Sequence, residues 1–270
     1  MKKLYLALAF AACSYHAQAH SPFLAPSNYV VSGDNTSILA GFAEHPFDSE
    51  VAIQGFDFHV IQPKGESKKL ELVNTSSLTT ANVESKVDGT YQIVGQRSAK
   101  IQYAKVGQRW LRVLDAKGAK VPPLDVRSFV LPTELTTKHE KFDVQRVDTL
   151  LSYFTKYQTS TIQPNLSQTG LALSFSKHPN SLKVGDQLKL NVQLNQKAVA
   201  GYQVQVEQQN TSVGEKTQVM KYTTNQQGQT DLSFKQSGQY VITISSPEHQ
   251  ENKKPEANTY RTMLSVFVSP

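Results

Sequence analysis

Apolar and polar side chains alternate without a break in Leu188-Lys189-Leu190-Asn191-Val192-Gln193-Leu194. Successive side chains of a β-strand point to opposite faces, so this run predicts a strand with one face in a core and the other in solvent. The alternation returns at Tyr202, Val204 and Val206 after a short polar break. Short strands of this kind, separated by turns, are typical of antiparallel β-sandwiches.

The same pattern extends over most of the chain and predicts an all-β fold. Residues 171–268 contain about seven such strands, and residues 36–114 contain a comparable set. We therefore expect two tandem immunoglobulin-like β-sandwich domains. One segment departs from the pattern, because Val147, Leu150, Leu151 and Phe154 have the spacing of one apolar helix face. They predict a short linking helix over residues 142–157.

A weak internal repeat supports two domains of similar design. Val31-Ser32-Gly33-Asp34 leads into one predicted strand and Val184-Gly185-Asp186 into another. Later, Asp88-Gly89-Thr90-Tyr91 matches Ser237-Gly238-Gln239-Tyr240. A tyrosine just after such a turn can fix a corner between strands of a sandwich. The expected organisation is a signal peptide at residues 1–19, an N-terminal sandwich at 20–133, a linker with a helix at 134–168, and a C-terminal sandwich at 169–270.

The first residues have the features of a bacterial secretory signal. Lys2 and Lys3 precede an apolar run, and Ala17-Gln18-Ala19 has the small residues that signal peptidase reads. Cleavage there would place the mature protein in the periplasm with His20 as its first residue. An alternative is a lipoprotein processed at Cys13, which would remove that terminus.

Composition excludes several classes of function. The 28 basic residues include Lys2 and Lys3, which leaves 26 against 22 acidic residues, scattered without a basic stripe. This argues against a nucleic-acid partner. The sole cysteine, Cys13, lies in the leader, so cysteine catalysis and cysteine metal sites are not expected. After the leader no apolar run is long enough for a membrane span.

A histidine at the mature N-terminus offers two metal ligands, its α-amine and its ring Nδ1. His45 follows a predicted strand, where Pro46 stiffens the chain, and Glu44 precedes it. Asp57 and His59 are two apart in a predicted strand and share a face. We therefore expect a site of His20, His45 and one of His59, Asp57 or Glu44 for a divalent transition metal ion. Nitrogen-rich ligation without sulfur suits nickel, copper or zinc, and leaves open which.

No catalytic residue is predicted, because the sequence has no nucleophile elbow, phosphate loop, dinucleotide fingerprint or His-Glu-x-x-His motif. The expected protein is not an enzyme but a metal carrier or uptake accessory. Two alternatives remain: a binding module without metal, and a copper-dependent oxidase acting on a polymer.

The order and spacing of several motifs resemble a known family. They include His45-Pro46-Phe47, the run from His178 to Asp186, the run from Lys197 to Val204, and Gly238-x-Tyr240. The chain is similar to the bacterial periplasmic family of unknown function described as the periplasmic component of a nickel-uptake transporter. This resemblance implies a metal-linked periplasmic role, a membrane transporter component as partner, and an immunoglobulin-like second half. It supports His20 and His45 as ligands.

Overall fold

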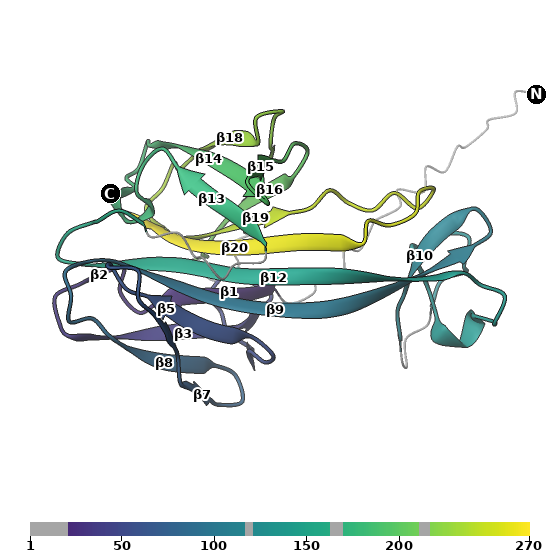
Figure 1. The fold of residues 1–270 in the computed structure, drawn as a ribbon, viewed down its shortest axis with the longest axis horizontal. Helices are drawn as coiled ribbons and strands as arrows, with labels where there is room; N and C mark the ends of the chain where they lie inside the picture. The colour runs from purple at the N-terminus through teal and green to yellow at the C-terminus, as the bar shows by residue number, and fades with distance from the viewer. Residues whose placement is uncertain (1–20, 117–120, 163–169, 211–216) are drawn as a thin grey trace, which may run out of the picture.

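The structure is a computed structural model that describes residues 21–116, 121–162, 170–210 and 217–270. Strands dominate it, and the described residues contain no α-helix, only two short 3₁₀ turns, η1 (Pro132–Glu134) and η2 (Pro179–Ser181). The predicted all-β class is therefore confirmed. Figure 1 shows three layers, with long strands in the middle and a smaller sheet on either side.

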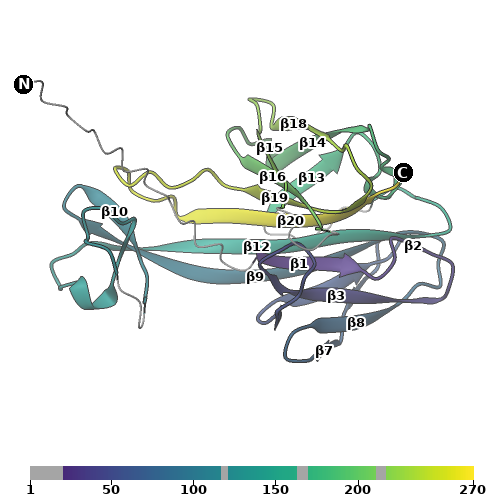
Figure 2. The same ribbon diagram turned by 180° about the vertical axis from the view of Figure 1, so that it is seen from behind.

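The lower layer in Figure 1 is an antiparallel sheet from the beginning of the chain. Its strand order is β1, β3, β8, β7, and a short β4 also pairs with β3. The bounds are β1 (Ser21–Pro26), β3 (Asn35–Ala43), β4 (Val51–Ala52), β7 (Leu72–Asn74) and β8 (Thr79–Glu84). Strand β1 pairs with β3 along its whole length and packs against the middle layer, as Figure 2 shows from behind.

The middle layer draws strands from both halves of the chain. Its path runs β11 (Phe129–Val130), β10 (Arg109–Val113), β9 (Gly89–Val106), β12 (Lys141–Lys156), β20 (Asn258–Val268), β19 (Gly238–Ser245), β16 (Gln203–Gln208) and β17 (Val219–Thr223). Off this path, β2 (Val30–Val31) pairs with β12, β5 (Asp57–Ile61) pairs with β9, and β6 (Ser67–Lys69) pairs with β5. The parallel pairing of β12 with β20 joins the two halves.

The upper layer contains the alternating run from Leu188 to Leu194. Here β14 (Gln187–Leu194) pairs with β13 (Leu171–Phe175), β15 (Lys197–Ala198) and β18 (Gln229–Ser233). Leu188, Leu190 and Val192 are fully buried, while Lys189 and Gln193 face solvent. The alternation thus predicted both this strand and the face that enters the core.

The predicted helix over residues 142–157 is wrong, because these residues lie in strand β12. Leu151 and Tyr153 enter the core under the upper layer, whereas Leu150 and Phe154 enter the core over the lower layer. A strand buried on both faces carries apolar residues at successive positions. The domain boundaries remain predictions. The structure adds that the expected linker supplies a central strand of the middle layer.

Two separate cores fill the spaces between the layers. The upper core includes Leu188, Leu190 and Val192 with Leu264 and Val266 of β20. The lower core joins Phe23, Ile38 and Phe58 with two side chains from the last part of the chain, Val241 and Met263. The two sandwiches therefore share the middle sheet, and neither core consists of residues from one half alone.

The internal repeat has a structural counterpart. Tyr91 donates its hydroxyl to the carbonyl of Val87 at 2.9 Å, and Tyr240 donates to the carbonyl of Gln236 at 2.8 Å, four residues back in each case. The glycines that precede them have φ angles of 126° and 134°, which side chains rarely adopt. Both sandwiches thus fix a corner with the same turn and tyrosine.

A buried ion cluster ties β9, β12 and β20 together. Asp148 is 1% exposed and accepts hydrogen bonds from Arg97 at 3.1 Å, Arg146 at 2.9 Å and Arg261 at 3.0 Å. Burial alone would raise the pKa of Asp148, but the charges of Arg261 and Arg146 and the hydrogen bonds outweigh it and hold the pKa below its ordinary value. The carboxylate therefore stays charged.

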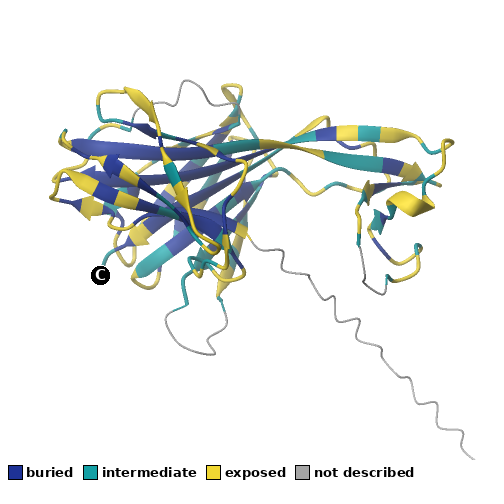
Figure 3. Ribbon diagram, turned by 90° about the horizontal axis from the view of Figure 1, so that it is seen from below, coloured by how far each residue is buried: buried dark blue, intermediate teal, exposed yellow. Residues whose placement is uncertain are grey.

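Beyond the three layers, β9 and β12 continue as a long arm that carries β10, β11 and η1 (Figure 1). Figure 3 shows that burial falls along this arm, whereas the layered body is largely buried. A small cluster of Ala104, Leu111 and Val130 stabilises its end. Within the part of the chain that the structure describes, no helix has the length and apolar character needed to cross a membrane.

Candidate functional site

His45 lies in a tight turn directly after β3. The amide of Asp48 donates to the His45 carbonyl at 3.1 Å, and the amide of Glu50 donates to the Phe42 carbonyl at 2.9 Å, which folds the turn back on the strand. Phe47 has a left-handed φ of 68°, a strained value for a bulky residue. The turn therefore has a defined shape, which suits a ligand position.

The ring of Phe47 anchors this turn to the first strand. It packs edge-on against Phe23 of β1, with the ring centroids 5.5 Å apart. The same strand brings the beginning of the described chain to this place, because Ser21 pairs with Ala43. His20 lies outside the described residues, but its neighbour Ser21 is thus opposite a residue two positions before His45.

The His45 side chain contacts the second half of the protein. Its Nδ1 lies 3.2 Å from the hydroxyl oxygen of Thr217, just before β17. This contact occupies Nδ1 and leaves Nε2 as the ring nitrogen for a ligand, since His45 is exposed. A hydrogen bond to the second nitrogen is the usual way in which proteins orient a metal-binding imidazole.

Two glutamates, Glu44 and Glu50, lie in the same turn region as His45. Glu44 is exposed, and its amide donates to a carboxylate oxygen of Glu50 at 3.0 Å. Glu44 was expected from the sequence, whereas Glu50 was not. Glu50 looks like an ordinary loop charge, and only the chain reversal between β3 and β4 brings it beside the turn.

Asp57 and His59 form a separate pair on β5. Their side chains share a face, as predicted, and His59 Nε2 lies 3.1 Å from a carboxylate oxygen of Asp57. Lys69 contacts the other oxygen at 2.7 Å. The hydrogen bonds from Lys69 and from His59 lower the pKa of Asp57. The carboxylate is therefore charged and shared by two basic partners.

The structure does not bring this pair to His45. On β5 the intervening Phe58 and the following Val60 enter the lower core, so Asp57 and His59 face away from the layer that carries His45. Among the described residues, no group of three or more His, Cys, Asp and Glu side chains is placed to hold a metal ion. The expected set thus divides into a turn with His45 and Glu44 and a pair on β5.

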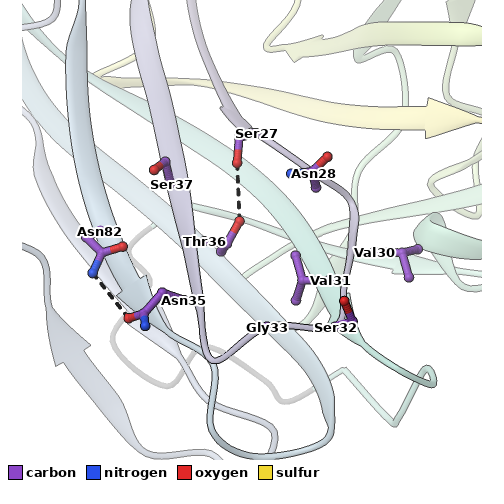
Figure 4. A pocket seen from close by; sticks show the side chains of 10 residues that line it. All are labelled: Ser27, Asn28, Val30, Val31, Ser32, Gly33, Asn35, Thr36, Ser37 and Asn82. Carbon is purple, nitrogen blue, oxygen red and sulfur yellow. Dashed lines mark hydrogen bonds between the residues drawn. The ribbon is translucent and has the colours of Figure 1, made fainter.

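A polar hollow of about 490 Å³ lies elsewhere on the lower layer, near the turn that connects β2 to β3 (Figure 4). In its lining the hydroxyls of Ser27 and Thr36 are hydrogen-bonded to each other with their oxygens 3.3 Å apart, and Asn82 donates to Asn35 at 3.3 Å. Its lining carries hydroxyls and amides but no charged side chain, namely Ser27, Asn28, Val30, Val31, Ser32, Gly33, Asn35, Thr36, Ser37 and Asn82. Such a surface suits a neutral polar ligand.

Comparison with solved structures gives distant similarities, including the following three. A DUF4785 family protein from Legionella pneumophila matches at 10% identity and a TM-score of 0.23, over 89% of this chain and 54% of that one, so this chain spans about half of its length. The chicken CNTN1 FN1–FN3 domains match at 11% identity and 0.23, over 93% and 100%. The D0–D1 domain of intimin matches at 11% and 0.21, over 90% and 97%.

No curated protein matches the sequence. A family model does match, and it extends over residues 17–248, which include the His45 turn, the pair on β5 and every strand except β20. The match covers most of the chain. The protein therefore belongs to the family defined by the domain of unknown function DUF4198.

Proposed function

We propose that the protein is a periplasmic carrier or uptake accessory for a divalent transition metal ion, which it holds with His20 at its mature N-terminus and with His45. One observation supports this most directly, the pairing of Ser21 with Ala43. Consecutive Cα atoms are about 3.8 Å apart, so the one-residue step from Ser21 to His20 and the two-residue step from Ala43 to His45 are short enough for both histidines to bind one ion.

The nitrogen and oxygen atoms available near the turn are of the kinds that bind divalent transition metal ions. His20 would supply its α-amine and ring Nδ1, His45 its Nε2, and Glu44 or Glu50 an oxygen. A set of nitrogens with one carboxylate and no sulfur suits Cu(II), Ni(II) or Zn(II). Thr217 would orient His45 from the opposite side of the ring. Asp57 and His59 stand outside this set.

Native mass spectrometry of protein secreted with its own leader tests the proposal. The expected result is a mass beginning at His20 that retains one ion after addition of Cu(II), Ni(II) or Zn(II). His45→Ala should weaken binding by at least the roughly 10–100-fold that loss of a ligand's hydrogen-bond partner costs, as should one alanine inserted before His20, because each removes a ligand itself. His59→Ala and His139→Ala are matched controls that should bind normally. Unchanged binding by the extended protein would contradict the terminal site.

A more specific version of the proposal is that the bound ion is nickel. This version rests on the resemblance to nickel-uptake components described above. A membrane transporter component would then be the partner that receives the ion. Adding nickel, copper and zinc together at equal concentrations in the same experiment shows which ion the protein prefers. Retention of nickel in the presence of zinc would support the uptake role, whereas exclusive retention of copper would assign the protein to copper handling.

The polar hollow between β2 and β3 favours a second candidate, a binding module without metal. Its uncharged hydroxyls and amides fit a neutral polar ligand such as a glycan segment. Protein with a correct His20 terminus that retains no ion, but loses glycan binding when Asn82 is changed to Ala, would support this candidate over the first.

A further inference from the structure

A cavity lies between the middle and upper layers, on the side of β12 that faces β13. It has a volume of about 470 Å³, within the usual range for sites that bind small organic molecules. Its apolar wall consists of Leu151 from β12, Leu171, Leu173 and Phe175 from β13, and Ile162. This site is separate from the His45 turn and from the polar hollow.

Gln92 supplies an unpaired polar group in the cavity wall. The residue is 5% exposed, and its amide oxygen has no hydrogen-bond partner among the described residues. Buried polar atoms are nearly always paired in folded proteins, because an unpaired one forfeits its hydrogen bond to water. An unpaired amide beside an apolar space therefore indicates a missing partner.

Tyr153 stands next to Gln92 on the same wall. The two residues are directly opposite in the pairing of β9 with β12, so their side chains share a face. Tyr153 is 2% exposed, and its ring packs edge-on against Phe175 at 6.2 Å. Burial raises the pKa of Tyr153 far above its ordinary value, which keeps the phenol protonated and able to donate.

The two basic residues of the wall, His178 and Lys177, already have partners. His178 accepts the amide of Asn180 at its Nδ1 and contacts the hydroxyl of Thr90 through Nε2. Lys177, the charged residue of the wall, is ion-paired with Asp186. The described residues of the wall therefore offer neither a free cation for an anion nor a carboxylate for a metal or amine, and they favour uncharged molecules.

We propose that this cavity binds an uncharged, mainly apolar small molecule that carries a hydroxyl group. The hydroxyl donates to the Gln92 amide oxygen and accepts from the Tyr153 phenol, while the apolar body fills the space between Leu151, Leu173 and Phe175. A hydroxyl matches both groups at once, because it is a donor and an acceptor. This activity is independent of the metal site.

Calorimetric titration of the whole protein with three probes of one size tests the proposal. The probes are 2-naphthol, 2-methoxynaphthalene, which cannot donate, and the anion 2-naphthoate. We expect 2-naphthol to bind at one site, 2-methoxynaphthalene to bind about tenfold more weakly because one hydrogen bond is lost, and 2-naphthoate to bind most weakly.

Variants assign the binding to this cavity. Gln92→Leu should abolish the preference for 2-naphthol over 2-methoxynaphthalene, Leu173→Trp should fill the space and remove binding of both, and the exposed Gln193→Leu is the matched control. If Gln92→Leu fails to fold, Tyr153→Phe provides the second test, with a reduced preference expected. Absence of saturable 2-naphthol binding to the wild type, or unchanged binding by Leu173→Trp, overturns the proposal.

Discussion

His45 Nδ1 lies 3.2 Å from the hydroxyl oxygen of Thr217, although 172 residues separate the two in sequence. The turn that carries the expected ligand is thus oriented by the other half of the chain. This arrangement means that the geometry of the proposed metal site depends on residues that no local sequence pattern would associate with it.

Thr217→Val should weaken metal binding without removing a ligand. The valine keeps the shape of threonine but loses the hydroxyl that orients His45, and loss of such a partner typically costs about tenfold in affinity. Chelator competition at neutral pH measures this change. Thr223→Val, on the exposed side of β17, is the control. Equal affinities of the two variants would show that Thr217 has no orienting role.

Metal affinity should rise with pH in protein that begins at His20. A free α-amine has a pKa of about 7.7–8.0, so a proton competes with the metal below that range. The expected gain is close to tenfold per pH unit between about pH 6.5 and 7.5. Chelator competition at several pH values gives the profile, and protein acetylated at its N-terminus should lack this component. Identical profiles would argue against ligation by the amine.

Asp148→Asn should destabilise the protein by about 3–5 kcal/mol, because it leaves Arg97, Arg146 and Arg261 without their shared buried counter-charge. Urea unfolding measures the change. The control on the same strand is Asp143→Asn, where an exposed contact with Lys100 should cost less than about 1 kcal/mol.

The Asp148 carboxylate should also make the free energy of unfolding depend on pH. The pKa of Asp148 is lower in the folded than in the unfolded protein, so its contribution to stability is complete above about pH 4 and is lost as the pH falls through the folded-state pKa. Asp148→Asn should therefore flatten the acid limb of the stability profile. A variant with the wild-type acid limb would contradict this assignment.

His178 should contribute stability that is also lost as the pH falls, but in a higher pH range than that of Asp148. Burial lowers its pKa, so the folded protein favours the neutral ring, whose Nδ1 accepts the Asn180 amide. This contribution is complete above about pH 6.5 and declines as the pH falls toward the folded-state pKa. His178→Asn retains a cap acceptor but does not titrate, so its urea midpoint should vary less between pH 7.5 and 5 than that of the wild type.

Tyr240→Phe should cost about 1 kcal/mol, because it removes a hydrogen bond that fixes a corner. Tyr91→Phe should cost at least as much, because the Tyr91 hydroxyl also accepts the Val87 amide at 2.9 Å. Tyr222→Phe is the comparison, since the hydrogen bond of its hydroxyl within the described residues is a weak one to the sulfur of Met220, at 3.7 Å. Thermal unfolding of the three variants gives the ranking. If Tyr222→Phe were as costly as the other two, the corners would carry no special stability.

The sequence was informative where structure depends on local pattern. The alternation of apolar and polar residues identified β14 and its buried face, and the glycine–tyrosine repeat identified both corners. The two-residue spacing of Asp57 and His59 along a strand placed both side chains on one face. Each inference uses residues within a few positions of one another, where the geometry of a strand or turn fixes the outcome.

The error at β12 has a definite cause. Val147, Leu150, Leu151 and Phe154 follow helical spacing, but a strand between two cores also needs apolar residues on both faces. Nothing within residues 142–157 shows that β9 and β20 flank them. The sequence did not predict the position of Glu50, the Asp148 cluster or the Gln92 cavity for the same reason. Each is formed by segments that are distant in sequence and meet only in the folded structure.

The sharing of the middle sheet has a consequence for the order of folding. Val241 and Met263 belong to the lower core, whose other residues come from the first two thirds of the chain. A polypeptide that emerges N-terminus first cannot complete that core until its last strand, β20, is available. We expect the lower core to remain loosely structured until β20 is available, and then to fold slowly, because its decisive contacts are distant in sequence.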